Sequence, residues 1–212
     1  MKTNPEIRME ARAALSGNWG KGIIVTIVYW LLSIVASLPQ VLFPVGSVAG
    51  SIIYLLAYIF FAFPVAFGLN MTYLRFLRGE TLDADHIFGA FNSTFYKKSI
   101  AVNLLSAIYI FLWSLLLIVP GIIKSLSYCL APYILIDNPS LTGEQAICQS
   151  MKMMDGHKMD LFLILLGYAG LSILSALLLF IPMLWIVPYY MTVFTKFYEN
   201  VKAEYTPVAV IE

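Results

Sequence analysis

Residues 99–136 read SIAVNLLSAIYIFLWSLLLIVPGIIKSLSYCLAPYILI and contain one charged residue, Lys124. Two further stretches, residues 22–74 and 161–195, contain no Asp, Glu, Lys or Arg, so every other charge of the chain lies outside these three apolar stretches. A charge at the centre of a bilayer costs about 2.5 to 3.5 kcal/mol on insertion scales, and membrane segments therefore avoid charges. This distribution predicts an integral membrane protein whose charges mark where the chain meets water.

The overall composition excludes two classes of protein. Hydrophobic residues make up 60% of the 212-residue chain and charged residues 12%, compared with about 45 to 50% and about 25% in an average soluble domain. The 13 basic and 12 acidic residues leave a net charge of only +1, whereas a nucleic-acid-binding protein needs a strongly basic surface. We therefore expect neither a water-soluble fold nor nucleic acid as a partner.

The lengths of the apolar stretches predict the number of membrane segments. One helix needs about 20 residues to cross about 30 Å of hydrocarbon, so each stretch approaches or completes two crossings. Two crossings per stretch place all basic residues except Lys124 on one side, which by the positive-inside rule is the cytoplasm. We predict an all-α, polytopic transmembrane bundle of about six membrane segments, multi-pass, with both termini cytoplasmic.

Prolines indicate where each stretch turns to form a hairpin. The expected turns lie at Pro39 to Pro44, at Pro120-Gly121 and at Pro182 to Pro188. The second and third stretches are slightly too short for two full crossings. Their return arms are therefore expected to be short, tilted or broken, and the sequence leaves open whether they span fully or are re-entrant.

An amphipathic helix is predicted at the cytoplasmic interface before each hairpin. Asn4-Pro5-Glu6 is typical of a helix start and Gly17 of a stop, while Thr142 with Gln145 fits a capping box and Gly156 ends that helix. The apolar stripes that we assign to these helices contain Ile7 and Leu15 in the first, Ile87, Phe88 and Phe91 in the second, and Ile147, Met151 and Met154 in the third.

The succession of helix and hairpin suggests an internal repeat. The chain is expected to form a single integral membrane domain, residues 1–212, containing repeat units at 5–78, 82–138 and 140–202. Local similarity between the units is weak. Convergent, low-complexity membrane sequence therefore remains an alternative explanation.

Few polar side chains within the three apolar stretches are candidates for binding a substrate. The candidates for substrate binding are Lys124, Asn70 and Asn103. Lys124 either snorkels to the far interface or faces a protein interior, and the asparagines are also the residue type that joins membrane helices by hydrogen bonds. Since no catalytic constellation is present, we expect neither an enzyme nor a cofactor.

The cluster Asp83-Ala84-Asp85-His86 is the only compact set of metal-ligand residue types. Acidic residues in the first turn of a helix also interact favourably with its dipole, which explains the two aspartates without a metal. We therefore expect no metal site.

Short motifs stand in a fixed order along the chain: Arg8, Ala11-Arg12, Leu15, Gly17 and Trp19; Pro120-Gly121-Ile122-Ile123 with Tyr128; Asp137-Asn138-Pro139; Ser150 with Met154 and Gly156; and Pro188-Tyr189 with Phe197-Tyr198-Glu199. Together they resemble the uncharacterised bacterial integral membrane protein family catalogued as domain of unknown function 975. The resemblance covers nearly the whole chain. It implies a bacterial inner-membrane location and no particular activity.

Two functions remain in competition. The first is a non-enzymatic membrane module for assembly, regulation or bilayer organisation, with membrane lipids, other membrane proteins or a second copy of the chain as partners. The alternative is a small permease or lipid-handling carrier with a polar path near Lys124. A packed interior favours the module, and a continuous polar cavity that reaches Lys124, Asn70 and Asn103 favours the carrier.

Overall fold

The computed structural model describes residues 2–44 and 46–205, and these residues form helices and connecting turns with no strand among them. The long helices are α2 (Trp19–Leu42), α4 (Phe63–Leu77), α5 (Tyr96–Leu116), α9 (Lys158–Leu177) and α10 (Met183–Glu204). The shorter ones are α1 (Asn4–Leu15), α3 (Val48–Ala57), the π-helix η1 (Tyr58–Ala62), the 3-10 helix η2 (Ala84–Phe91), α6 (Ile118–Tyr128), α7 (Ala131–Asp137) and α8 (Gly143–Met153).

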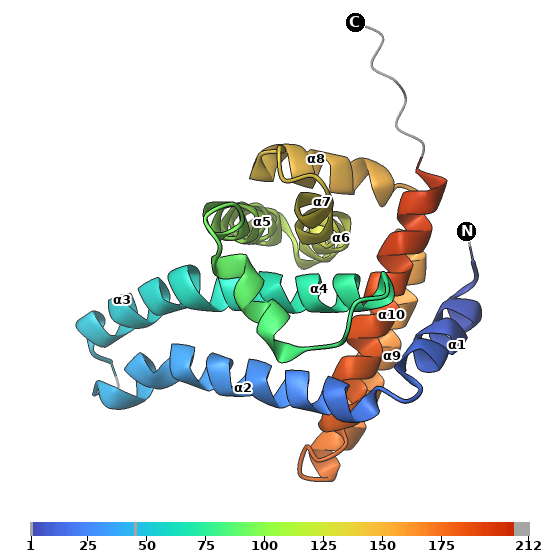
Figure 1. Ribbon diagram of the computed structural model, residues 1–212. Helices are drawn as coiled ribbons and strands as arrows, with labels where there is room; N and C mark the ends of the chain where they lie inside the picture. Colours follow the sequence, from blue (N-terminus) through green and yellow to red (C-terminus); the bar gives the residue numbers. More distant parts are fainter. Residues whose placement is uncertain (1, 45, 206–212) are drawn as a thin grey trace, which may run out of the picture.

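The long helices form three pairs. In the first pair α2 packs against α3 and α4, in the second α5 packs against α6, and in the third α9 packs against α10. Figure 1 shows the first pair lying across the view, the third crossing its end steeply, and the second seen nearly end-on. The three helical pairs therefore extend in three different directions from a common centre, which we call the hub: α1, η2, α7, α8 and the C-terminal halves of α4 and α10.

Five helical segments of the described residues are long and apolar enough to cross a membrane. They are Trp19–Leu42, Val48–Leu77, Tyr96–Leu116, Ile118–Asp137 and Lys158–Leu177. α10 is not among them, since its C-terminal half carries Lys196, Glu199, Lys202 and Glu204. The all-helical prediction is confirmed, and these five segments support a membrane protein, whereas the count of about six segments and their arrangement as hairpins stay predictions.

Two of the three predicted turns contain one of their prolines, since Pro44 lies between α2 and α3 and Pro182 is the N-cap of α10, whereas the middle turn lies before its proline. The second pair turns at Leu117, whose backbone is extended, and Pro120 lies within the first turn of α6. The prediction of a turn at Pro120-Gly121 was therefore wrong by three residues, because proline has no N–H to lose in the first turn of a helix. Pro39 and Pro188 likewise lie inside helices, at the end of α2 and within α10.

The short helices begin and end largely where capping residues predict. The capping box of Thr142 and Gln145 is present at α8. At α1 the cap is Thr3, one residue before the predicted Asn4, because Thr3 rather than Asn4 forms the reciprocal box with Glu6. Gly17 and Gly156 end their helices with positive φ of 79° and 81°, the left-handed conformation that favours glycine.

The apolar stripes of the short helices pack against protein. Ile7, Leu15, Ile87, Ile147 and Met154 are fully or almost fully buried, and Phe91 and Met151 are half-buried. Of the eight predicted stripe residues, Phe88 alone is largely exposed, at 49%. The stripes therefore hold the hub together and offer little apolar surface for direct contact with lipid.

The packing partners of the short helices follow a cyclic order. α1 packs on α10, η2 packs on α4, and α8 packs on α5, α6 and α7. η2 thus covers the second arm of the first pair, and α8 covers the second arm of the second pair. α1, which precedes all three pairs in the chain, covers the second arm of the third pair. This order closes the hub into a ring.

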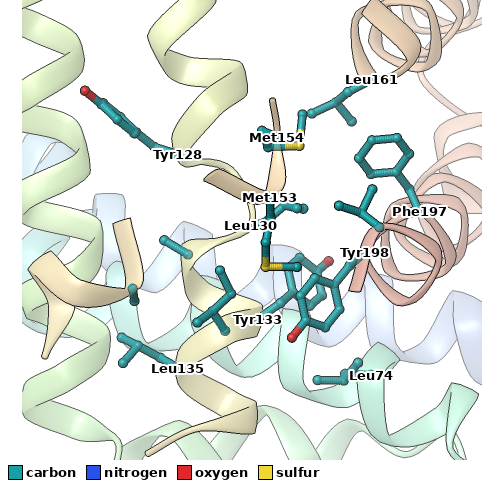
Figure 2. Packing of buried hydrophobic residues seen from close by; sticks show 14 of the residues in the cluster. Leu74, Tyr128, Leu130, Tyr133, Leu135, Met153, Met154, Leu161, Phe197 and Tyr198 are labelled. Carbon is teal, nitrogen blue, oxygen red and sulfur yellow. The ribbon is translucent and has the colours of Figure 1, made fainter. Parts of the chain in front are cut away.

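The interior of the hub is filled by side chains from α1, α4, η2 and every helix from α5 to α10. Figure 2 shows Leu74 of α4, Tyr133 and Leu135 of α7, Met153 at the end of α8, Leu161 of α9 and Phe197 and Tyr198 of α10 converging on one region. Tyr133 and Tyr198 stack with their ring centroids 5.1 Å apart. A core packed in this way leaves no open channel through its centre along these residues.

Gly68 offers a test of the contact between η2 and α4. A Cβ added at Gly68 would lie 2.0 Å from the carbonyl oxygen of Ile87, so Gly68→Ala must push η2 away from α4. We expect it to lower the free energy of unfolding by about 1 to 3 kcal/mol, measured by thermal unfolding in detergent.

Gly170→Ala is the matched control, because nothing lies within 4 Å of the added Cβ in the middle of α9. It should leave stability unchanged or raise it by up to about 1 kcal/mol. Equal melting temperatures for Gly68→Ala and wild type would contradict the close approach of the two helices.

Candidate functional site

The three residues predicted to bind a substrate lie on three different helices. Lys124 is on α6, Asn103 on α5 and Asn70 on α4, and all three are half-buried. The Asn103 amide donates to the carbonyl of Ser99 at 2.8 Å, within its own helix. In residues 2–44 and 46–205 no hydrogen bond joins any two of the three, and none of them lines a cavity described below.

The charge of Lys124 has partners inside the protein. Its Nζ lies 4.9 Å from the centre of the Trp113 ring and 4.0 Å from Sδ of Met151. An ammonium over an indole face gains about 0.5 to 2 kcal/mol, depending on how far it is desolvated. These contacts correspond to the second alternative for Lys124, a cation that faces protein, and they account for the residue without a substrate.

A charged cluster that the sequence did not predict lies where α4, α7 and α10 meet. We call it the carboxylate clamp: Arg78, Asp137, Tyr198, Glu199 and Lys202. The Arg78 guanidinium donates to both oxygens of Asp137, at 2.6 and 3.0 Å. The Tyr198 hydroxyl donates to Oδ2 at 2.6 Å, and the Lys202 ammonium donates to the same oxygen. Glu199 accepts from Nε of Arg78 at 2.9 Å.

Burial makes the clamp energetically important. The Asp137 side chain is 5% exposed, and a buried carboxylate is tolerated only when it is paired and hydrogen-bonded. Two parallel bonds from one guanidinium are among the strongest arrangements available. The hydrogen bond to Asp137, reinforced by Glu199, raises the pKa of Arg78 above its ordinary value.

The bonding pattern indicates what the clamp can do. Asp137 accepts four hydrogen bonds from three side chains. A carboxylate with its lone pairs so occupied locks helices together and is poorly placed to accept a proton from a substrate. The sequence did contain a signal, because Asp137 and Tyr198-Glu199 belong to the motifs of the family resemblance, but nothing local linked them to Arg78.

A second polar arrangement, which we call the polar seam, runs between the arms of the first helical pair. It consists of hydroxyl and amide side chains spaced three or four residues apart on each arm, which places them on one face of each helix. Its members are Tyr29, Ser33, Ser37 and Gln40 on α2, and Ser47, Ser51, Tyr54 and Tyr58 on the facing arm.

The seam encloses two small cavities on either side of Tyr54. One, of about 170 Å³, lies at the tip of the pair, and the other, of about 120 Å³, lies deeper, beside the π-helix η1. Beyond the deeper cavity the side chains of Val25, Val65 and Tyr73 are buried. The seam can therefore hold water from the tip inward, but packed side chains lie between it and the hub.

Ser150 satisfies the backbone where the second pair breaks. Between α6 and α7 the helix is interrupted, and the Ser150 hydroxyl of α8 donates to the carbonyl of Ser127 at 2.7 Å and accepts from the N–H of Leu130 at 3.2 Å. Pro132 lies at the start of the resumed helix α7. A side chain from the hub thus closes a gap in a membrane-type segment.

The acidic cluster at the start of η2 behaves as a helix cap. The Asp83 carboxylate accepts from the N–H of Asp85 at 3.2 Å, and Nε2 of His86 lies 3.7 Å from Glu80. Among the residues that the structure describes, no group of three or more His, Cys, Asp or Glu side chains could hold a metal ion.

Comparison with known proteins identifies a family and no function. The sequence matches the family model described as "Protein of unknown function (DUF975)" over residues 1–127 and 115–205. No curated protein and no solved structure matches the chain. The matched residues include the clamp and the polar seam, and the resemblance noted in the sequence is confirmed.

Asp137→Asn tests the clamp. The amide keeps the shape of the side chain but leaves Arg78 and Lys202 without their buried counter-charge. A fully buried pair loses about 3 to 5 kcal/mol when one partner is removed. Since Arg78 and Lys202 remain partly exposed, we expect a loss of about 1 to 3 kcal/mol in the free energy of unfolding. Asp155→Asn, on an exposed turn, should have no effect, and equal losses in the two variants would count against the clamp.

Proposed function

The chain belongs to the DUF975 family of proteins of unknown function, and we propose that it is a non-enzymatic module of the bacterial inner membrane that organises the bilayer and assembles with other membrane proteins. The single observation that carries this proposal is the division of its surface. Exposed apolar arms extend in three directions from one charged, densely packed hub. Such a shape is suited to holding lipid or helices around it.

The three helical pairs then form three membrane hairpins, about six segments in all, with the hub and both termini on the cytoplasmic side. The exposed surface of the arms supports this. Large apolar side chains face outward along every pair, among them Leu31, Ile34 and Val41 in the first, Phe111 and Leu115 in the second, and Leu166, Ile173 and Leu177 in the third. Exposed apolar surface on this scale indicates contact with lipid or with other proteins.

The arrangement of polar groups supports a structural function for the hub. The clamp residues bind one another, and the Ser150 hydroxyl is used by the broken helix. A catalytic site needs a nucleophile or base that is free to meet a substrate. We therefore propose that the protein is not an enzyme.

The carrier alternative requires a path that involves Lys124. The contacts of Lys124 with Trp113 and Met151 supply a different reason for its presence, and the cavities of the polar seam are lined by other residues. In proteoliposomes, Lys124→Met should therefore leave solute and lipid flux unchanged. A tenfold fall in flux would favour the carrier over the module.

Bilayer organisation is tested by reconstituting the protein at increasing density into vesicles of phosphatidylethanolamine and phosphatidylglycerol. We expect the mean vesicle diameter in electron micrographs to fall as the protein-to-lipid ratio rises. Diameters that do not depend on protein density would overturn the proposal.

Phe88→Glu adds a variant to this experiment. Phe88 is the exposed apolar residue of η2, so a charge there weakens the contact of the hub with the lipid interface and should reduce the effect on diameter. Ser93→Glu places the same charge on a nearby exposed polar position and should not. Deleting residues 1–17 is a poorer test, because it removes Ile7 and Leu15 from the core.

A further inference from the structure

We infer that the first helical pair alone crosses the bilayer, whereas the second and third pairs end inside the hydrocarbon core, so that their tips contact the ends of lipid acyl chains. The inference rests on the proposed function in one respect, namely that the hub lies at the cytoplasmic interface. The depth that each pair reaches then follows from where its arms contact the hub.

The second pair is anchored to the hub close to its tip. Ser150 of α8 is bonded to the carbonyl of Ser127 at 2.7 Å, and the turn of the pair lies at Leu117. The ten helical steps from Leu117 to Ser127 rise about 15 Å, and the hydrocarbon is about 30 Å thick. Since α8 carries charged residues, among them Glu144 and Lys152, the tip reaches no further than about the middle of the bilayer.

The first arm of the second pair leads to the same conclusion. A Cβ added at Gly143 of α8 would lie 3.2 Å from the backbone nitrogen of Val102, so α5 touches the hub there. From Val102 to Leu116 the helix rises about 21 Å. Neither arm is long enough to carry the turn across about 30 Å, even if it ran along the membrane normal.

The third pair is anchored to α1 by two arginines. Nη2 of Arg8 donates to the carbonyl of Leu163 at 3.4 Å, and a Cβ added at Gly167 would lie 2.9 Å from the same nitrogen. From Gly167 to Leu177 the helix rises about 15 Å. The first arm of this pair therefore also stops about halfway.

The return arm of the third pair contacts the hub even sooner. Arg12 lines an open pocket of about 290 Å³ together with Trp19, Trp185 and Tyr189. Trp185 is only five residues from Phe180 in the turn, which corresponds to about 8 Å of helical rise. A turn this close to Arg12 cannot lie on the opposite side of the membrane from it.

The first pair is long enough to cross. From Trp19 to Leu42, α2 rises about 35 Å. On the other arm Phe61 already contacts Phe91 of η2, about 21 Å of helical rise from Ser47, so the length of α2 carries the crossing. Its tip also contains polar groups, because Gln40, Ser47 and Ser51 line the outer cavity of the seam, beside the exposed apolar side chains of Val41, Leu42 and Val48. Such a tip is suited to water on the far side.

The other two tips are apolar throughout. Residues 115–119 are LLLIV and residues 177–181 are LLLFI, and their side chains are between 56% and 83% exposed. Leaving each such side chain in water forfeits about 1.5 to 3 kcal/mol relative to burial. Lipid hydrocarbon is therefore the environment that fits them.

Part of the backbone of these tips is hydrogen-bonded within the turns. In the third turn the N–H groups of Phe180 and Ile181 donate to the carbonyls of Ser175 and Leu178, at 2.9 and 3.2 Å. In the second, Leu117 donates to Trp113 at 3.3 Å, and Pro120 has no N–H to satisfy. Turns that lie in hydrocarbon need such internal bonding, because an unpaired backbone group there costs several kcal/mol.

The directions of the three helical pairs agree with the depths inferred for their tips. Because the three pairs extend in different directions (Figure 1), no more than one of them can lie along the membrane normal. A helix at a large angle to the normal penetrates less deeply than its length. Two hairpins of half depth would occupy one leaflet only, which gives the proposed organisation of the bilayer a direction: the cytoplasmic leaflet is expanded relative to the outer one.

Single cysteines test the depth of each tip. In the full chain with Cys129→Ala and Cys148→Ser, the variants are Ser47→Cys, Leu117→Cys and Leu177→Cys, with Asp155→Cys on the hub. We expect a membrane-impermeant maleimide to label Ser47→Cys from outside cells and Asp155→Cys only from the cytoplasmic side. Leu117→Cys and Leu177→Cys should react at least tenfold more slowly from either side.

A spin label on the same cysteines reports depth directly. Labels at the second and third tips should collide with oxygen and be shielded from a water-soluble nickel complex, whereas the label at Ser47→Cys should be open to the complex. Val48→Cys, Ile118→Cys and Ile181→Cys supply second positions in the three tips, in case a first variant fails to fold.

The outcomes separate this inference from the proposed function. Labelling of Leu117→Cys or Leu177→Cys from outside at the rate of Ser47→Cys would overturn the inference alone. Failure of Ser47→Cys to react from outside would overturn the crossing of the first pair. Labelling of Asp155→Cys from outside would instead remove the cytoplasmic hub, and with it the proposed function.

Discussion

The buried carboxylate of Asp137 is the interaction on which the rest of the hub depends. It is bound by Arg78 at the end of α4 and by Tyr198 and Lys202 on α10, while it terminates α7 itself. One side chain thus joins the second arms of all three helical pairs. Because a buried charge needs all its partners, the three arms are held at fixed positions, and the directions of the pairs follow from them.

The sequence predicted what depends on composition and local capping. The distribution of charge predicted a membrane protein, and Gly17, Gly156 and the Thr142–Gln145 box predicted the ends of the short helices. It could not predict the clamp, because Arg78 and Asp137 are 59 residues apart and only tertiary packing brings them together. The same holds for Lys124, whose ring contact with Trp113 depends on how tightly α5 and α6 turn.

The polar seam and the apolar tips show that pairs with similar composition can have different tasks. The seam residues were visible in the sequence as Ser and Tyr at helical spacing, but α3 had to be placed against α2 before their common face was evident. By contrast, the sequences of the two apolar tips, LLLIV (residues 115–119) and LLLFI (residues 177–181), do not differ in character from the rest of an apolar stretch. Their significance comes from the short distance to Ser150 and Arg12 in the folded chain.

The contact of α1 with α10 has a consequence for biosynthesis. α1 is synthesised long before α10, and Ile7 of α1 is buried in the core that contains Phe197 and Tyr198 of α10. Domains that rely on contacts between distant residues complete their folding late. The ring therefore closes only after α10 has been synthesised, and until then the nascent chain presents an amphipathic helix without its packing partner to the ribosome, the insertion machinery and any chaperone nearby.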